Sequence, residues 1–481
     1  MPTSPSLKTD LYIDGAWRAA AAGERFAVLN PADESMIAEV ASATVEDAMA
    51  ALDAAEAAFA GWAARKPRER AEVLRRAFEL FSARAGEFAR LMTLENGKAR
   101  ADALGEARYS AEFFRWFSEE AVRIEGQLGH APSSGARVMV RHAPSGVAVL
   151  VTPWNFPAAM GARKIAPALA AGCPVIVKPA SETPLTMLAL ADLLEEAGVP
   201  PGVVNVIPSR QSGKVVEALL SDMRVRVVSF TGSTEVGRRL LRSAAENIVT
   251  PAMELGGNAP AIVFDDADLE AAVEGVTIAK LRNMGEACTA ANRIYVQEGV
   301  AAAFTARLAE RFAKLRVGNG LDEAVDIGPL VNAETRDKVT AFVADALARG
   351  ARLVLGGQAP EGRGFFYPPT VLADVPEDAD CVRDEIFGPV AAIQTFRDQA
   401  EVIARANATE YGLVAYVFTG DLRRGLQVCE RLDFGMVGLN RGIVSDPAAP
   451  FGGMKQSGLG REGGHEGIHE FMETQYISVD W

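Results

Sequence analysis

The chain has 481 residues and a formal net charge of -14, with 49% hydrophobic and 23% charged residues. This is an ordinary globular composition, and the length favours two or three domains over a single core. The acidic balance argues against nucleic-acid binding, which needs concentrated Lys and Arg, so any anionic ligand must be held by local basic groups.

The predicted elements begin with helices. Residues 1–17 lack the apolar stretch of a signal peptide, and residues 45–117 have the helical periodicity of several amphipathic helices. Residues 137–140 and 146–152 are β-branched runs separated by the turn-like sequence HAPSG, which predicts a hairpin or paired strands.

From residue 146 onward, strands and helices alternate. Strands are predicted at 146–152, 174–178, 203–207 and 225–231, and helices at 158–171, 185–197, 213–220 and 235–246. A second alternating region begins with a strand at 261–264, a helix at 268–283 and a strand at 293–297. This order predicts α/β architecture with two doubly wound domains joined near residues 250–257.

The end of the chain carries one more strand candidate, residues 476–479, without an obvious local partner. It either pairs with another subunit or completes a sheet of its own chain. No apolar run reaches the roughly 18 residues of a membrane span. The four cysteines show no CxxC pair, which favours reduced thiols in a cytoplasmic protein. We therefore expect no membrane partner and no nucleic-acid partner.

A phosphate-binding turn is one candidate for chemistry. In Phe230-Thr-Gly-Ser-Thr-Glu-Val-Gly237 a strand ends, a glycine turns the chain and a helix opens with hydroxyl residues. Such a helix start presents free N–H groups and a positive dipole to a phosphate. The alternative is that Ser233 or Thr234 only caps the helix.

Cys288 follows the predicted helix in the loop sequence Asn-Met-Gly-Glu-Ala-Cys-Thr. A lone cysteine is more often a small buried apolar residue than a nucleophile, yet Gly-containing polar loops are where catalytic groups tend to lie. Glu254, in Met-Glu-Leu-Gly-Gly-Asn at the domain junction, is a candidate general base, with a hinge salt bridge as the alternative. A Cys/His hydrolase is disfavoured, because no histidine lies near a predicted strand end of the α/β regions.

The sequence His465-Glu-Gly-Ile-His469 matches the HExxH pattern of zinc proteases. Gly467 weakens the helix that would bring both imidazoles to one metal, and few residues follow to supply a third ligand. We therefore expect no metal site here.

The ordered motifs resemble the aldehyde dehydrogenase superfamily over nearly the whole chain. The resemblance rests on Pro153-Trp-Asn-Phe-Pro157, Lys178-Pro-Ala-Ser181, Phe230-Thr-Gly-Ser-Thr234, Glu254-Leu-Gly-Gly257, Gly285-Glu-Ala-Cys288, Glu385-Ile-Phe-Gly-Pro389 and Pro450-Phe-Gly-Gly453. It implies a Rossmann-like cofactor domain, a catalytic domain and a small β oligomerisation element. These would comprise residues 1–118 with 140–252, residues 253–452, and residues 119–139 with 453–481. A homodimer or homotetramer is implied.

The resemblance also assigns catalytic and cofactor roles. Cys288 would attack the aldehyde, Asn155 and the Cys288 N–H would form the oxyanion hole, and Glu254 would activate water against the thioester. The cofactor, NADP or NAD, would lie against Trp154, Lys178, Ser181, Gly232, Ser233, Leu255, Glu385 and Phe387. Ser181 leaves room for a 2′-phosphate, whereas Glu182 next to it would oppose one.

Within the superfamily the chain looks closest to succinate-semialdehyde dehydrogenases, through residues 156–164, 281–283 and 440–450. That similarity implies a clamp for a distal carboxylate made by Arg163, Arg282 and Ser445, for which two guanidinium groups and a hydroxyl are suitable. Succinate semialdehyde is the expected substrate, with glutarate semialdehyde or a neutral aldehyde as the alternative.

Two departures from the family pattern lie beside the nucleophile. Glu286 stands where many members have glutamine, and its carboxylate would either raise the pKa of the thiol or change the hydrogen bonds of the loop. Ala290 stands where some relatives carry a second cysteine, so no local disulfide with Cys288 is expected.

Overall fold

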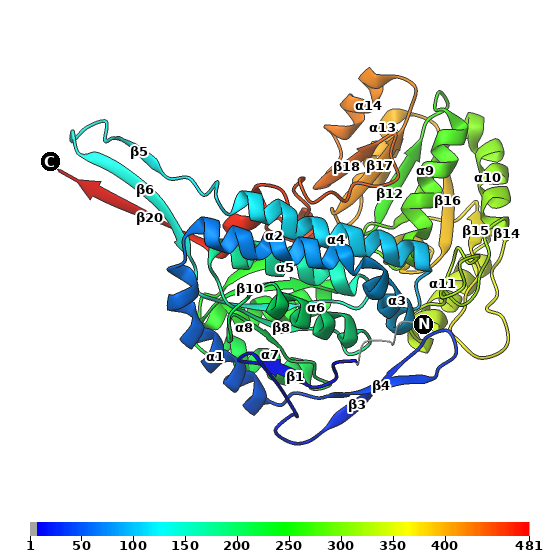
Figure 1. Ribbon diagram of the computed structural model, residues 1–481. Coiled ribbons are helices and arrows are strands. Elements are labelled where there is room, and N and C mark those ends of the chain that lie inside the picture. Colours follow the sequence, from blue (N-terminus) through cyan, green and yellow to red (C-terminus); the bar gives the residue numbers. More distant parts are fainter. Residues whose placement is uncertain (1–6, 481) are drawn as a thin grey trace.

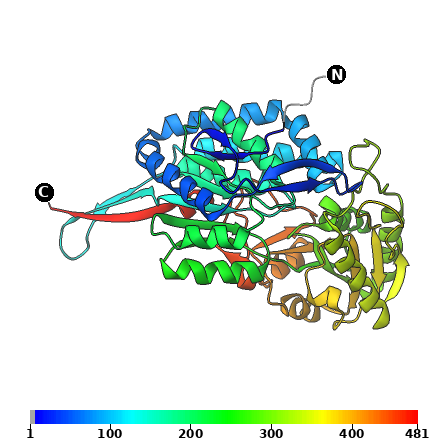
Figure 2. The ribbon, with the colours of Figure 1, turned by 90° about the horizontal axis from the view of Figure 1, so that it is seen from below.

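In the computed structural model, which describes residues 7–480, two large β-sheets lie side by side with helices against their faces, and a small three-stranded sheet projects to one side (Figure 1). Seen from below, the two helix-covered sheets form separate halves of the molecule (Figure 2). The predicted fold class, α/β with two doubly wound units, is confirmed. No helix within residues 7–480 is long and apolar enough to cross a membrane.

The first sheet has five parallel strands at its centre and short antiparallel strands at its edges. Its order is β19-β11-β10-β7-β8-β9-β1-β2. The central strands read as unbroken apolar runs because helices cover both faces. The strands are β1 Leu11–Ile13, β2 Ala16–Arg18, β7 Val147–Val151, β8 Val175–Lys178, β9 Val204–Val206, β10 Val225–Thr231, β11 Thr250–Glu254 and β19 Gly458–Leu459.

Helices cover both faces of this sheet, and α5 (Pro157–Ala171) is buried along its whole length. Its small side chains allow close packing, and a Cβ added at Gly161 would lie 2.2 Å from Met187 Cε. This packing holds the start of α5 in one place, and with it Asn155 and Phe156, which directly precede the helix. The other helices are α1 Val45–Ala63, α2 Pro67–Ala83, α3 Ala85–Asn96, α4 Arg100–Glu120, α6 Pro184–Glu196, α7 Ser212–Leu220 and α8 Thr234–Glu246.

The second sheet has the order β14-β15-β16-β13-β12-β17-β18, parallel except for β14. Its strands are β12 Ala259–Val263, β13 Ala291–Gln297, β14 Arg352–Leu355, β15 Thr370–Ala373, β16 Val390–Phe396, β17 Val414–Phe418 and β18 Met436–Leu439. Its helices are α9 Leu269–Leu281, α10 Glu298–Ala313, α11 Ala333–Ala348, α12 Asp380–Arg383, α13 Gln399–Asn407 and α14 Leu422–Cys429.

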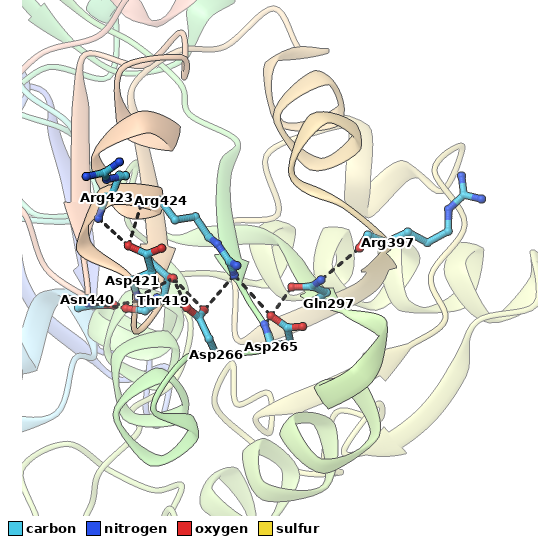
Figure 3. Close-up of polar contacts among 9 residues, drawn as sticks. All are labelled: Asp265, Asp266, Gln297, Arg397, Thr419, Asp421, Arg423, Arg424 and Asn440. Carbon is cyan, nitrogen blue, oxygen red and sulfur yellow. Dashed lines mark hydrogen bonds and ion pairs between the residues drawn. The ribbon is translucent and has the colours of Figure 1, made fainter.

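A polar network closes the carboxyl end of this second sheet (Figure 3). The Asp266 carboxylate, just after β12, accepts from the Thr419 hydroxyl at 2.8 Å and pairs with Arg424 at 3.1 Å. Asn440, after β18, donates to the Thr419 carbonyl, and Gln297 at the end of β13 accepts from the Asp265 N–H. These bonds tie together the ends of four strands on the side where ligands of parallel sheets usually bind.

The three-stranded sheet, ordered β20-β6-β5, is built from β5 (Gln127–His130), β6 (Arg137–Pro144) and β20 (Met472–Val479). The prediction of paired strands at 137–140 and 146–152 is wrong. β6 pairs with β5 and β20, whereas β7 is inserted between β8 and β10. Gly146, at φ +130°, redirects the chain between them. The terminal strand completes a sheet of its own chain.

Three strands, β6, β11 and β19, do not follow the domain boundaries expected from the sequence. β6 extends four residues beyond position 140, and β11 continues across position 252. β19 lies within the segment expected to form the oligomerisation element, yet it pairs with β11 of the first sheet. Likewise the helix predicted over 268–283 ends at Leu281, because Asn283 and Met284 adopt positive φ. A separate hairpin, β3 (Arg25–Leu29) with β4 (Met36–Ala41), completes the strands.

Candidate active site

The two sheets place the predicted site residues at facing edges. Asn155 follows β7, Lys178 ends β8, Ser233 follows β10 and Glu254 ends β11, all at the carboxyl edge of the first sheet. Cys288 precedes β13, and Glu385 precedes β16, at the amino edge of the second. The site is therefore assembled between the sheets.

The nucleophile loop has an unusual backbone. Asn283, Met284 and Gly285 have φ of 54°, 57° and 78°, a left-handed run that costs energy for the first two residues. Asp102 accepts from the Asn283 N–H at 2.8 Å, and a Cβ at Gly285 would lie 2.3 Å from the Gly388 carbonyl oxygen. Contacts from another helix and from the second sheet thus impose the turn that presents Cys288.

Cys288 is half-buried in this loop. Burial raises the pKa of its thiol to about 12. Arg163 and Arg282 act in the opposite direction, whereas the carboxyl groups of Glu385 and Glu254 add to the increase. The groups expected to surround the reaction therefore lie close enough to influence the sulfur, and the resting group is the neutral thiol.

Asn155 lies opposite the nucleophile loop and is 4% exposed. Its side-chain Nδ2 donates to the carbonyl of Glu286 at 3.1 Å, and its Oδ1 accepts from the Phe156 N–H at 3.1 Å. Its backbone carbonyl accepts from Lys98 Nζ at 2.7 Å and Asn283 Nδ2 at 2.9 Å. The amide is thus fixed, and one Nδ2 hydrogen already has a partner.

A buried ion pair between Lys98 and Glu106 contacts the backbone of Asn155. Lys98 and Glu106 are both fully buried and ion-paired, and Glu106 Oε1 accepts from the N–H groups of Ala158 and Ala159. The carboxylate thereby satisfies the start of α5, where the helix dipole favours a negative charge. Because Lys98 also donates to Asn155, one pair positions both the helix and the candidate oxyanion donor.

Glu254 is 3% exposed, and neither carboxyl oxygen has a hydrogen-bond partner among residues 7–480. Burial, together with the nearby charge of Glu462, raises its pKa well above the ordinary value, against the opposing effects of Arg163 and Lys164. A carboxyl group with no fixed partner and a raised pKa fits a general base that meets a mobile water. The alternative predicted for Glu254, a hinge salt bridge, is not present among residues 7–480.

Arg163 and Lys164, adjacent on α5, share the carboxylate of Glu462. Arg163 is 1% exposed, its guanidinium carbon lies 4.2 Å from the centre of the Phe451 ring, and its Nη2 has no hydrogen-bond partner within residues 7–480. The residue predicted for the clamp is therefore held by an ion pair while one donor remains available.

Arg282 and Ser445 meet in a cleft of about 420 Å³, where Arg282 Nη1 donates to Ser445 Oγ at 3.3 Å. The Arg282 guanidinium carbon also lies 4.8 Å from the centre of the Phe156 ring. The structure thus brings together two of the three residues predicted for the clamp. The cleft is further lined by Tyr109 and Ile443.

The residues predicted to hold the cofactor phosphates and ribose lie along the first sheet. Lys178 donates to Ser212 Oγ at 2.8 Å, and burial lowers its pKa to about 8. Ser181 donates to the Ser209 carbonyl at 3.3 Å. Ser233 is exposed and caps α8 through the Val236 N–H at 3.4 Å, while the adjacent Gly232 donates to the Glu254 carbonyl at 3.1 Å.

Of the other predicted cofactor residues, Glu385 and Phe387 precede β16 of the second sheet, whereas Trp154 and Leu255 follow strands of the first. Glu385 accepts from the Gly257 N–H at 3.1 Å, and burial raises its pKa to about 7. The rings of Trp154 and Phe387 meet edge to face with centres 5.4 Å apart. Leu255 packs against Gly237 of α8, where an added Cβ would lie 2.4 Å from Leu255 Cδ2. An exposed helix start, aromatic edges and carboxyl groups suit a dinucleotide.

Glu286, the unexplained residue beside the thiol, directs its side chain away from the chemistry. It is fully buried, Oε1 accepts from the Val331 N–H at 3.0 Å, and Oε2 has no partner in the described part of the chain. Its backbone carbonyl accepts from both Asn155 and Asn283. Of the two effects predicted for Glu286, a raised pKa of the thiol or altered hydrogen bonds of the loop, these contacts agree with the second.

The HExxH segment lies mainly in a 3₁₀ helix, Glu466–Phe471, rather than an α-helix. His465 Nδ1 pairs with Glu120 Oε2 at 2.6 Å, and its ring centre lies 5.2 Å from that of His469. Within residues 7–480, no group of three or more potential ligands is arranged to hold a metal ion.

Sequence reasoning missed three supporting groups: the Lys98–Glu106 pair, Glu462 and Tyr109. Lys98 and Glu106 are charged residues among many in a helical region, and only their complete burial distinguishes them. Tyr109 belongs to no motif. Glu462 is separated from Lys164 by 298 positions, so only the fold reveals the pair.

The fold and the site together combine two α/β units with a half-buried thiol, a fixed amide and a carboxyl group that has no partner among residues 7–480. The model of the aldehyde dehydrogenase family matches residues 17–477, and the chain belongs to this family. It is 55% identical to succinate-semialdehyde dehydrogenase of Paenarthrobacter nicotinovorans over 92% of this chain and 99% of that protein.

Another relative and two solved structures are similar over nearly the whole chain. Glutarate-semialdehyde dehydrogenase of Pseudomonas aeruginosa is 48% identical over 98% of each chain. The crystal structure of succinate-semialdehyde dehydrogenase from Burkholderia pseudomallei has a TM-score of 0.97 and 46% identity, and 99% of each chain is covered. A complex of Bacillus cereus aldehyde dehydrogenase with NAD⁺ has a TM-score of 0.96 and 36% identity, covering 98% of this chain and 96% of that chain.

Proposed function

We propose that this enzyme oxidises succinate semialdehyde to succinate with NADP or NAD, through a thioester on Cys288. The observation that carries the proposal is the unpartnered donor of buried Arg163 together with the Arg282–Ser445 contact in the neighbouring cleft. A buried cation with a free donor favours an anionic ligand, and guanidinium groups bind carboxylates strongly.

The chemistry follows from the three catalytic candidates. The Cys288 thiol loses its proton to solvent water, and the sulfur bonds to the aldehyde carbon while the carbonyl π electrons move to oxygen. The Cys288 N–H and the second Nδ2 hydrogen of Asn155 stabilise that oxyanion. When bound, the cofactor supplies the hydride acceptor. Glu254 then takes a proton from water, the resulting hydroxide attacks the thioester, and the acid leaves as the thiol is restored.

The cofactor residues fit a dinucleotide. The exposed start of α8, capped by Ser233, offers N–H groups to a pyrophosphate. Lys178 and Ser181 would meet the adenosine ribose or its 2′-phosphate, and Glu385 the nicotinamide ribose. Relatives are named for both cofactor types: an Escherichia coli enzyme, 48% identical, is an NADP(+) enzyme, and the Bacillus cereus structure contains NAD⁺.

The alternative substrates are glutarate semialdehyde, which names a relative at 48% identity, and a neutral aliphatic aldehyde. The same clamp would accept the extra methylene of glutarate semialdehyde, whereas a neutral aldehyde would leave the guanidinium donors unpaired. The carboxylate preference is therefore the feature that distinguishes these classes.

We also propose a cytoplasmic homo-oligomer, a dimer or tetramer. Its cofactor domain would comprise residues 1–118 with 140–252, its catalytic domain residues 253–452, and its oligomerisation element residues 119–139 with 453–481, except that β19 pairs with the first sheet. The projecting β20-β6-β5 sheet supports this proposal, because Leu128 and Tyr476 are 69% and 59% exposed on it. Sedimentation equilibrium of the full chain would decide the oligomeric state.

The test of the function is a steady-state screen of succinate semialdehyde, glutarate semialdehyde and butanal with each cofactor. We expect the highest kcat/KM with succinate semialdehyde, and Arg282→Ala to remove most of its advantage over butanal. Equal kcat/KM for all three aldehydes in the wild type would contradict the proposal.

A further inference from the structure

Tyr109 has a buried hydroxyl and lies beside the cleft that holds Arg282 and Ser445. It lies on α4 and lines the same cleft. Its oxygen is shielded from solvent and has no hydrogen-bond partner among the residues that the structure describes. A buried unpaired hydroxyl is costly, so such a group in a cleft indicates a missing partner.

The ring of Tyr109 is fixed by its neighbours. It packs against the apolar cluster of Phe156, Met160 and Ala287, which joins the start of α5 to the nucleophile loop. It also meets the Phe113 ring edge to face, with centres 4.8 Å apart. The hydroxyl therefore has a defined position beside the chemistry and cannot readily turn toward water.

Two cations, Arg163 and Arg282, and one carboxylate, Glu462, lie near this hydroxyl. Burial raises the pKa of Tyr109, while Arg163 and Arg282 both lie near enough to lower it. The phenol therefore stays protonated and can donate near neutral pH. Arg163 Nη2 likewise has no partner within residues 7–480. A buried hydroxyl and a buried guanidinium nitrogen that both lack partners favour a ligand with a negatively charged acceptor.

We propose that the Tyr109 hydroxyl donates a hydrogen bond to the distal carboxylate of the aldehyde substrate and so determines specificity. This inference rests on the proposed function, since it needs a substrate with that carboxylate. A carboxylate has two oxygens and about four acceptor positions, enough for Tyr109 in addition to Arg163, Arg282 and Ser445. Tyr109 thus becomes a fourth member of the clamp.

The test is Tyr109→Phe, which removes only the oxygen. We expect kcat/KM for succinate semialdehyde to fall roughly 10- to 100-fold, mainly through KM, the range for one hydrogen bond to a charged group. For butanal, which lacks the carboxylate, kcat/KM should not change. Inhibition by succinate should weaken by a similar factor, and inhibition by butanol should not.

Thermal unfolding provides a second readout. Because the hydroxyl is unpaired, Tyr109→Phe should leave the melting temperature of the ligand-free protein unchanged or slightly higher. The matched control is Tyr367→Phe in the second core, where the hydroxyl donates to the Gly357 carbonyl at 3.2 Å. That variant should lower the melting temperature and keep the substrate preference.

The outcomes separate the two proposals. An equal loss with both aldehydes, or no loss with either, overturns the role of Tyr109 while the wild-type preference for succinate semialdehyde persists. A wild type that shows no preference over butanal overturns the proposed function, and the inference fails with it. A lower melting temperature for Tyr109→Phe also contradicts an unpaired hydroxyl.

Discussion

The side-chain amide of Asn155 donates to the backbone carbonyl of Glu286 at 3.1 Å. The proposed oxyanion donor is thus bonded to the residue two positions before the thiol. Because the carbonyl occupies one Nδ2 hydrogen, the orientation of the other is fixed before substrate arrives. Such preorganisation is what makes a hydrogen-bond donor effective in a transition state.

Replacing Asn155 by alanine should therefore lower kcat by roughly 100- to 1,000-fold, the usual cost of removing one oxyanion donor. Single-turnover measurement of hydride transfer would check this value. The circular dichroism spectrum and cofactor affinity should remain close to those of the wild type. A decrease in kcat of less than threefold would exclude Asn155 from the oxyanion hole.

The hydrogen bond between the Glu286 carboxyl group and the Val331 N–H can be tested by substitution. Glu286→Gln keeps an acceptor for the Val331 N–H, whereas Glu286→Met leaves that buried N–H unpaired and should cost about 1–3 kcal/mol. Urea unfolding of both variants would measure the difference. Equal stability of the two variants would show that this hydrogen bond does not contribute to the free energy of unfolding.

Glu286 also predicts a pH dependence of stability. Burial raises its folded pKa well above 4.5, the ordinary value of a glutamate, so above pH 4.5 the unfolded chain releases a proton that the folded chain retains. Stability is therefore lost as pH rises from 4.5 through the folded pKa. Glu286→Gln should remove this loss, so its advantage over the wild type should grow between pH 5 and pH 8 in parallel urea titrations.

The Cys288 thiol should react slowly in the ligand-free protein. With a pKa of about 12, the thiolate fraction rises tenfold per pH unit across the neutral range. Alkylation by iodoacetamide, followed by mass spectrometry of the Cys288 peptide, should accelerate from pH 7 to pH 9 without a plateau. A plateau below pH 8 would place the pKa much lower, and Cys288→Ser serves as the blank.

Lys178 should link cofactor affinity to pH. Burial lowers its pKa to about 8, so the ammonium group is present below that pH and is lost above it. We expect the Kd for NADP to increase above pH 8 and Lys178→Met to abolish most of that increase. Fluorescence titration at pH 6.5 and pH 9 would measure the Kd for NADP of the wild type and of the variant. If the Kd of the variant increased with pH as much as that of the wild type, a group other than Lys178 would be responsible.

The sequence predicted the local alternation of strands and helices well, because the buried parallel strands from β7 to β11 are short apolar runs between helices of clear periodicity. It failed where pairing is long-range. Nothing between residues 137 and 152 distinguishes a hairpin from the observed arrangement, in which β6 pairs with β20 more than 300 residues away. Register across such distances depends on the whole fold.

The candidate site shows the same division. Motifs placed Asn155, Glu254 and Cys288, and these residues lie at facing sheet edges. Lys98 is distinguished by its complete burial, Tyr109 by its unpaired hydroxyl and Glu462 by its pairing with residues far away in the chain. None of these properties can be recognised from the neighbouring sequence. Supporting residues are therefore recognised only when three-dimensional contacts are known.

Glu462 has a consequence for how the protein matures. It provides the carboxylate for Arg163 and Lys164, which are buried at the centre of the first half of the chain. During synthesis α5 emerges almost 300 residues before that carboxylate, and breaking such buried pairs is costly. The packing around Arg163 and Lys164 therefore becomes complete only after Glu462 has been synthesised.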